Sequence, residues 1–148
     1  MTTVITSVMV PVAVSVATTL ITLYVFQPIQ GQRQLIGEIA YATRYYRTAT
    51  AKVRAEVRDP QAAKAKAEEA TQALLVLSAQ LAASPATLPV RGKSYKLFES
   101  LRLVEPRDTV SNASSALRAW AYWMRMGDSQ AAQRYRLEVI KVLDLPKD

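Results

Sequence analysis

The chain begins with a long uncharged segment, and its first charged side chain is Arg33. Within that segment, Val4 to Phe26 consists mainly of aliphatic and aromatic residues with Ser, Thr and Ala. At about 1.5 Å per residue, a helix of about 20 such residues matches a hydrocarbon core about 30 Å thick. We therefore expect one transmembrane helix, followed by a more polar part, rich in Lys and Arg, outside the membrane.

A cleaved secretory signal is the main alternative interpretation of this segment. Ser15-Val16-Ala17 has the small residues that a signal peptidase accepts, but no Lys or Arg precedes the apolar run. The run also continues for nine residues beyond Ala17, to Phe26. These features favour an uncleaved anchor.

The distribution of basic residues predicts the orientation of the anchor. Lys and Arg close to a membrane span are retained on the cytoplasmic side. The N-terminal flank has neither, whereas several follow the span, namely Arg33, Arg44, Arg47, Lys52 and Arg54. We predict a single-pass protein of the cell inner membrane, with its N-terminus outside and a cytosolic C-terminal domain.

The length and composition of the chain limit what the domain can be. We divide the 148 residues into an anchor and hinge, 1–31, and one cytosolic domain, 32–148. The net charge of +7 favours anionic partners. Because the chain has no Cys and no His, disulfides, thiolate zinc sites and imidazole acid–base chemistry are excluded. We expect no metal, no cofactor and no enzymatic activity.

Beyond the anchor, apolar residues recur at helical spacing. Gln27 to Gly31 contains a proline and a glycine, so we expect the anchor to end or kink there. Two helices should then pack antiparallel, joined by a tight turn at Arg58-Asp59-Pro60 in which Asp59 caps. The expected contact positions, which we call seams, are Leu35, Ile39, Ala42, Tyr46, Ala49 and Val53, then Ala63, Ala67, Ala70, Leu74, Leu77 and Leu81.

The remaining residues predict three more helices. After a connection at 84–93, the pattern indicates a short helix over about 94–104 and a longer one over about 109–126. Gly127 should end the latter, and Asp128 or Ser129 should cap a last helix. No window shows sustained strand-like alternation. The predicted fold is all-α, with one N-terminal transmembrane helix followed by a small bundle of four or five short cytosolic helices.

One face of the anchor carries small and hydroxyl-bearing residues at steps of three and four. These residues are Ser7, Pro11, Ser15, Thr18 and Thr22. Helices in lipid associate through close packing of small residues and modest hydroxyl hydrogen bonds. This hydroxyl stripe is a candidate surface for self-association or for contact with another membrane protein. Alternatively, each hydroxyl bonds to a carbonyl of its own helix and the face meets lipid.

The first cytosolic helix carries a candidate basic face. Its members, which fall within about 80° of one another on a regular helix, are Arg33, Arg44, Arg47, Arg54 and Arg58. Beside a membrane, such a face can hold anionic lipid headgroups. Nucleic acid, with Tyr41 and Tyr45 stacking on bases, is the least favoured partner. The plainest interpretation is a solvated face that also sets topology.

Trp120 and Trp123 lie three residues apart in the predicted 109–126 helix. At that spacing both are typical of a helix core. The less favoured interpretation is that one of them anchors a partner protein, because aromatic side chains dominate many interfaces.

Two functions from different classes fit these features. The preferred hypothesis is a non-catalytic adaptor that presents a helical binding surface at the cytoplasmic face of a membrane. Its partners would be membrane lipid, another membrane or cytosolic protein, or a second copy of the chain. The alternative is a membrane-active oligomeric effector, holin-like or toxin-like, that assembles through the hydroxyl stripe.

Overall fold

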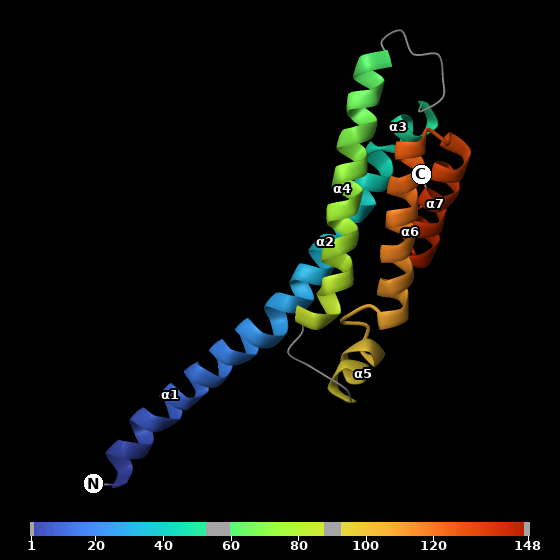
Figure 1. Ribbon diagram of the computed structural model, residues 1–148. Coiled ribbons are helices and arrows are strands. Elements are labelled where there is room, and N and C mark those ends of the chain that lie inside the picture. Colours follow the sequence, from blue (N-terminus) through green and yellow to red (C-terminus); the bar gives the residue numbers. More distant parts are fainter. Residues whose placement is uncertain (1, 53–59, 88–92, 147–148) are drawn as a thin grey trace.

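The computed structural model describes residues 2–52, 60–87 and 93–146, and these contain helices and no strands. One long helical rod leads into a bundle (Figure 1). The rod comprises α1 (Thr2–Ile21), the π-helical turn η1 (Thr22–Phe26) and α2 (Gln27–Tyr45), with no loop between them. The predicted all-α class and the predicted apolar N-terminal helix are confirmed.

The sequence predicts an end or a kink at Gln27 to Gly31, and the helix does not end there. A proline ring within a regular α-helix clashes with the carbonyl four residues earlier, which here belongs to Tyr24. The turn before Pro28 instead has π geometry, in which the Gln27 N–H donates to the Thr22 carbonyl five residues back. This wider turn accommodates the ring without interrupting the helix. The expected hinge is therefore a local irregularity within one continuous rod.

The rod and α4 (Pro60–Thr87) form the expected antiparallel pair. Tyr46 Oη donates to Glu69 Oε1 at 3.5 Å, and Gln32 Nε2 donates to Ser84 Oγ at 3.3 Å, so the contacts run in opposite chain directions. Figure 1 shows the same arrangement. After a break at Tyr46 the chain continues as α3 (Arg47–Lys52). The Arg58-Asp59 turn and its cap lie outside the described residues.

α4 continues into the segment that the sequence predicts to be a connection. It passes through Pro85, which has no N–H to donate to the Leu81 carbonyl. The Ser84 hydroxyl donates to that carbonyl at 2.9 Å instead. A local side-chain bond thus replaces the missing backbone bond and extends the helix to Thr87.

The bundle is completed by α5 (Lys93–Ser100), α6 (Arg107–Met126) and α7 (Ser129–Val142). α5 is shorter than expected, because the chain turns at Arg102, whose φ is 54°. The predicted end of α6 is confirmed: Gly127 has a φ of 77°. Asp128 is the cap of α7, where its Oδ1 accepts from the Gln130 and Ala131 N–H groups at 3.0 Å each.

The core forms where α2, α4, α6 and α7 meet. All the predicted seam residues whose side chains are described are buried or half-buried, and only Val53 lies outside them. The fully buried side chains include Ile39, Leu74, Leu117, Trp120 and Val139. Burial of these seams is the main force that holds the bundle together.

Candidate membrane-facing site

α1 and η1, which we call the stem, extend away from the bundle as an exposed apolar helix (Figure 1). Its large apolar side chains from Val12 to Tyr24, and that of Phe26, are 46% to 59% exposed, whereas Val25 is half-buried. The helix from Pro11 to Tyr45 is long and apolar enough to cross a membrane, and 6% of its apolar part is buried in the protein. A core helix would be mostly buried, so the stem is of the kind found in membrane anchors and signal sequences.

The hydroxyl stripe lies along this exposed stem. Thr18 Oγ1 donates to the Val14 carbonyl at 2.8 Å, and Thr22 Oγ1 donates to the Thr18 carbonyl at 2.9 Å. Thr19, which is not in the stripe, makes the same kind of bond to the Ser15 carbonyl at 2.9 Å. In these bonds each hydroxyl donates to a carbonyl of its own helix, as the alternative interpretation expects. Because Thr19 does the same, the bonds do not set the hydroxyl stripe apart from the rest of the stem. Pro11 and Ser15 are exposed, and the side chain of Ser7 lies outside the described residues.

The basic face is interrupted in the structure. Its prediction assumes a regular helix from Arg33 to Arg58, but α2 ends at Tyr45 and α3 begins at Arg47. Arg33, Arg44 and Arg47 are exposed, whereas Arg54 and Arg58 lie outside the described residues. Arg33 Nη2 donates to the Arg102 carbonyl at 3.4 Å and so links α2 to the turn after α5.

Tyr41 and Tyr45 are exposed on α2 beside Arg44. Their rings stack on each other, with centroids 5.5 Å apart and an interplanar angle of 19°. The Tyr45 and Tyr46 rings form a T-shaped pair with centroids 4.9 Å apart. The two exposed rings thus form an aromatic surface on the outside of the rod.

The two tryptophans differ in position. Trp120 is fully buried, and its Nε1 donates to Thr50 Oγ1 at 3.2 Å. A side chain without exposed surface cannot anchor an external partner, so Trp120 has the core role and not the anchor role. Trp123 is half-buried against the core, edge-on to exposed Tyr122 at 5.2 Å. Trp123 therefore remains a candidate contact residue.

Arg136 is a key residue that the sequence interpretation missed. It lies on α7 with 4% of its surface exposed, and its Nη1 donates to the Thr43 carbonyl at 3.0 Å. That carbonyl belongs to the last turn of α2, where the helix breaks and carbonyls lose their partners. The spacing of residues could have indicated its burial. Arg136 is four residues after Ala132 and three before Val139, and so lies on the buried face of α7.

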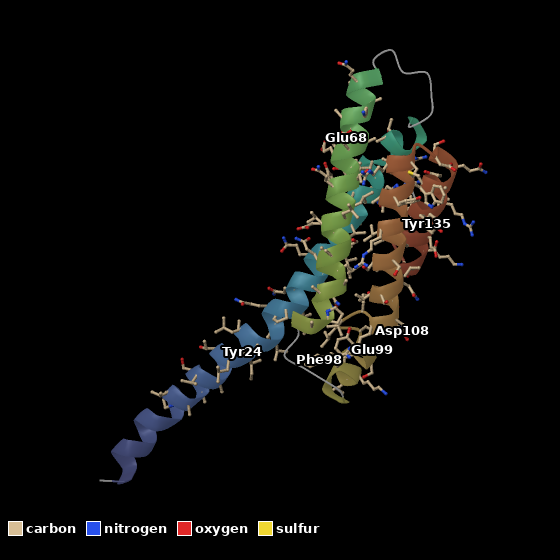
Figure 2. The ribbon with its side chains drawn as sticks, in the orientation of Figure 1. Tyr24, Glu68, Phe98, Glu99, Asp108 and Tyr135 are labelled. Carbon is tan, nitrogen blue, oxygen red and sulfur yellow. The ribbon has the colours of Figure 1, made fainter. Side chains whose placement is uncertain are left out.

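A second apolar cluster joins the rod to the base of the bundle. This junction cluster consists of buried Ile29, Tyr95 and Val104, with Val25, Phe98 and Leu103 packed against them. The cluster therefore joins the start of α2 to α5 and the loop after it, and Val25 at the end of the stem packs against this cluster. Figure 2 shows Phe98 at the base of the bundle and Tyr24 farther out on the stem.

Buried Gln32 ties three segments together beside the junction cluster. Its Nε2 donates to Ser84 Oγ on α4 at 3.3 Å, and its Oε1 accepts from the Glu105 N–H at 3.0 Å. Tyr95 Oη donates to the Glu105 carbonyl at 2.6 Å. The Arg107 guanidinium lies 4.5 Å from the centre of the Tyr95 ring. The start of α2 is thus fixed to α4 and to the loop before α6.

Replacing Tyr95 with Phe should lower the free energy of unfolding by about 1 kcal/mol at neutral pH, because the bond to Glu105 is lost. Burial raises the pKa of the Tyr95 hydroxyl above its usual 10.0, and Arg107 opposes that rise. A raised pKa favours the protonated fold, so this stabilisation is complete below pH 10 and is lost as pH rises through the higher pKa.

Thermal unfolding of the two proteins, followed by circular dichroism at pH 7 and pH 11, tests this expectation. The difference between parent and Tyr95→Phe should shrink at pH 11. Tyr122→Phe is the control. Because Tyr122 is exposed, this variant should melt at the same temperature as the parent. A difference that grows with pH would contradict the assigned donor role of the Tyr95 hydroxyl.

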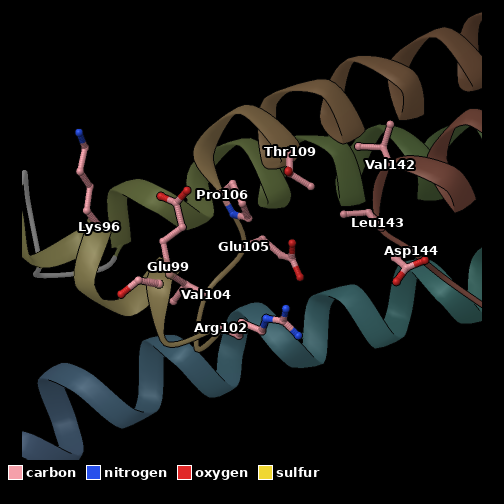
Figure 3. A pocket seen from close by; sticks show the side chains of 11 residues that line it. Lys96, Glu99, Arg102, Val104, Glu105, Pro106, Thr109, Val142, Leu143 and Asp144 are labelled. Carbon is pink, nitrogen blue, oxygen red and sulfur yellow. The ribbon is translucent and has the colours of Figure 1, made fainter.

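A cleft of about 760 Å³ opens between the base of the bundle and the end of α7. Figure 3 shows Val142, Leu143 and Asp144 on one side of it and α5 with the following loop on the other. Its charged side chains have mixed signs: Lys96, Glu99, Arg102, Glu105 and Asp144. In the part of the chain that the structure describes, no group of three acidic side chains could hold a metal ion. The cleft therefore identifies no ligand class.

Comparison with known proteins assigns no family. No protein-family model matches the chain, and no curated protein or solved structure matches it. Function is therefore inferred from the chain's own features, above all the exposed apolar stem and its continuity with the bundle.

Proposed function

We propose that the protein is a non-catalytic adaptor held in a membrane by its uncleaved stem, with the bundle on the cytoplasmic side. The observation that carries this proposal is the continuous helix from Thr2 to Tyr45. From Pro11 to Phe26 its exposed side chains are apolar or hydroxyl-bearing, while its second half is packed into the bundle. A helix, unlike a flexible linker, holds a binding surface at a fixed distance from the membrane.

The aromatic surface of Tyr41 and Tyr45 is the best candidate contact for a protein partner. Tyrosine rings supply a large contact area with few rotatable bonds, and they are enriched at interfaces. Arg44, another enriched residue type, lies beside them. The half-buried Trp123 and exposed Tyr122 offer a second aromatic contact on α6.

The full-length protein should remain in the membrane pellet after alkaline carbonate washing, because a spanning helix is not released by a change in charge. A reporter fused to the C-terminus should be cytosolic, and intact mass should show that no segment has been removed. Val14→Arg combined with Val16→Arg should release the protein, since each arginine costs about 3 kcal/mol at the centre of a span.

Val14→Leu combined with Val16→Leu is the matched control and should stay in the pellet. A mature chain that starts at Thr18 would show that the stem is a cleaved signal. A periplasmic reporter would contradict the predicted orientation while leaving the anchor intact.

Growth and dye entry on overexpression separate the adaptor from the oligomeric effector. An adaptor should leave the membrane sealed. An effector should admit dye, and leucine at Ser15, Thr18 and Thr22 should abolish the leak by blocking close packing. The same substitution at Val12 and Val16 is the control for a general change in the stem.

A further inference from the structure

α5 and the residue directly after it, Leu101, expose two large apolar side chains on one side. Leu97 and Leu101 are 58% and 59% exposed. The Leu101 N–H donates to the Leu97 carbonyl at 3.0 Å, so the two residues share one helical turn and lie on the same face. Tyr95 and Phe98 pack into the junction cluster instead. α5 therefore has one apolar face inside the protein and a second one open to the surroundings.

The junction cluster fixes the level of α5 along the stem. Val25 and Ile29, which contact this cluster, stand at the end of the uncharged apolar run. If the run fills the hydrocarbon core, these residues lie at the boundary between acyl chains and headgroups. Exposed Tyr24 suits the same level, because tyrosine is enriched at membrane interfaces. Figure 1 shows α5 at the end of the bundle nearest the stem.

Basic side chains lie near the open face of α5, beside the cleft whose charges have mixed signs. Lys96 and Arg102 are exposed, and Arg33 reaches the carbonyl of Arg102. Half-buried Glu99 is the acidic residue on α5 itself. Exposed leucines flanked by Lys and Arg are the pattern of helices that lie in the membrane surface, with apolar side chains in the acyl boundary and cations among headgroups.

We propose that α5 is an interfacial helix that inserts Leu97 and Leu101 into the bilayer surface, a second membrane contact beside the span. The proposal rests on the proposed anchor and adds which end of the bundle meets lipid. Contact at two places fixes the tilt of the bundle as well as its distance from the membrane. The opposite end of α6, at Met126, then points away from lipid.

Single-cysteine labelling of the full chain tests this contact directly, because the parent sequence has no cysteine. An environment-sensitive dye is attached at Leu97→Cys or Leu101→Cys, and the protein is reconstituted in phosphatidylcholine–phosphatidylglycerol vesicles. Lipids with a nitroxide near the headgroup should quench most of the emission, while aqueous iodide should quench little. Met126→Cys, exposed at the far end of α6, should show the reverse.

A label at Val16→Cys tests the span separately. If deep nitroxide lipids fail to quench it, the proposed anchor is wrong. If they quench it while the α5 labels respond only to iodide, the anchor stands and the interfacial helix is wrong. If the α5 labels are shielded from both quenchers, a second copy of the protein covers the face, which also overturns the proposal.

A label at exposed Ser100→Cys gives a second readout on folded protein. Leu97→Glu combined with Leu101→Glu should move it from lipid quenching to iodide quenching without loss of helicity. Leu75→Glu combined with Val76→Glu, a matched exposed pair on α4, should leave the label in lipid. Unchanged quenching in the α5 variant would show that these leucines do not make the contact.

Discussion

Leu74→Asp is expected to unfold the bundle, whereas Leu75→Asp should leave it folded. Leu74 is 0% exposed in the core and Leu75 is 47% exposed on the same turn of α4. A carboxylate at Leu74 would lose its hydration with no described partner in the apolar core, at a cost of about 4 kcal/mol or more. At Leu75 it would lie in a surface hollow that also contains Lys64 and Arg125.

Circular dichroism of the full chain in non-ionic detergent measures this contrast. Leu74→Asp should lose the cooperative melting transition of the bundle and keep the helical signal of the stem. Leu75→Asp should melt within a few degrees of the parent. Equal melting of both variants would show that the α4 seam is assigned to the wrong face.

Arg136→Met should lower the free energy of unfolding by about 2 kcal/mol, the usual contribution of a hydrogen bond to a charged group. The guanidinium is buried and donates to the Thr43 carbonyl at 3.0 Å, where α2 breaks. Met fills a similar volume but leaves that carbonyl without this donor. Arg136→Lys should recover part of the loss, because a single ammonium cannot reproduce the planar fork.

Arg134→Met is the control, since Arg134 is exposed on the same helix. Chemical denaturation in detergent gives both free energies from one type of experiment. If the two methionine variants unfold at the same denaturant concentration, the Thr43 carbonyl does not depend on Arg136.

The helices that bury one continuous seam were predictable from the sequence. α2, α4 and α6 repeat apolar residues at steps of three and four, and Gly127 and Asp128 are local signals whose effect does not depend on the rest of the fold. The path of the chain through Pro28 was not predictable in this way. Ile29 and Gln32 are held by α5, α4 and the loop before α6, and these contacts outweigh the local tendency of proline and glycine to end a helix.

The candidate site was less predictable because it depends on contacts distant in sequence. The regular helix on which the basic face was predicted breaks at Tyr46, where the sequence has neither proline nor glycine. Around it, Trp120 donates to Thr50 Oγ1, whose hydroxyl donates to the Tyr46 carbonyl at 2.7 Å. Together with the bond from Arg136, these bonds hold α6 and α7 against the break, although both helices are distant from it in sequence. The periodicity of one helix does not indicate these contacts, because their partners lie in other helices.

The continuous helix through the π turn fixes the orientation of the stem about its own axis relative to the bundle. Each residue in an α-helix advances the chain by about 100° and 1.5 Å, and a π turn contains one residue more than the α-helical turn it replaces. Removing one residue from the α-helical part of the stem would therefore turn the residues before it by about that angle, whereas removing one from Thr22 to Phe26 would let an α-helical turn replace the π turn and leave the orientation nearly unchanged. Because the helix is continuous, a membrane neighbour that rotates the stem about its axis would also rotate α5, the aromatic surface and the cleft relative to the membrane.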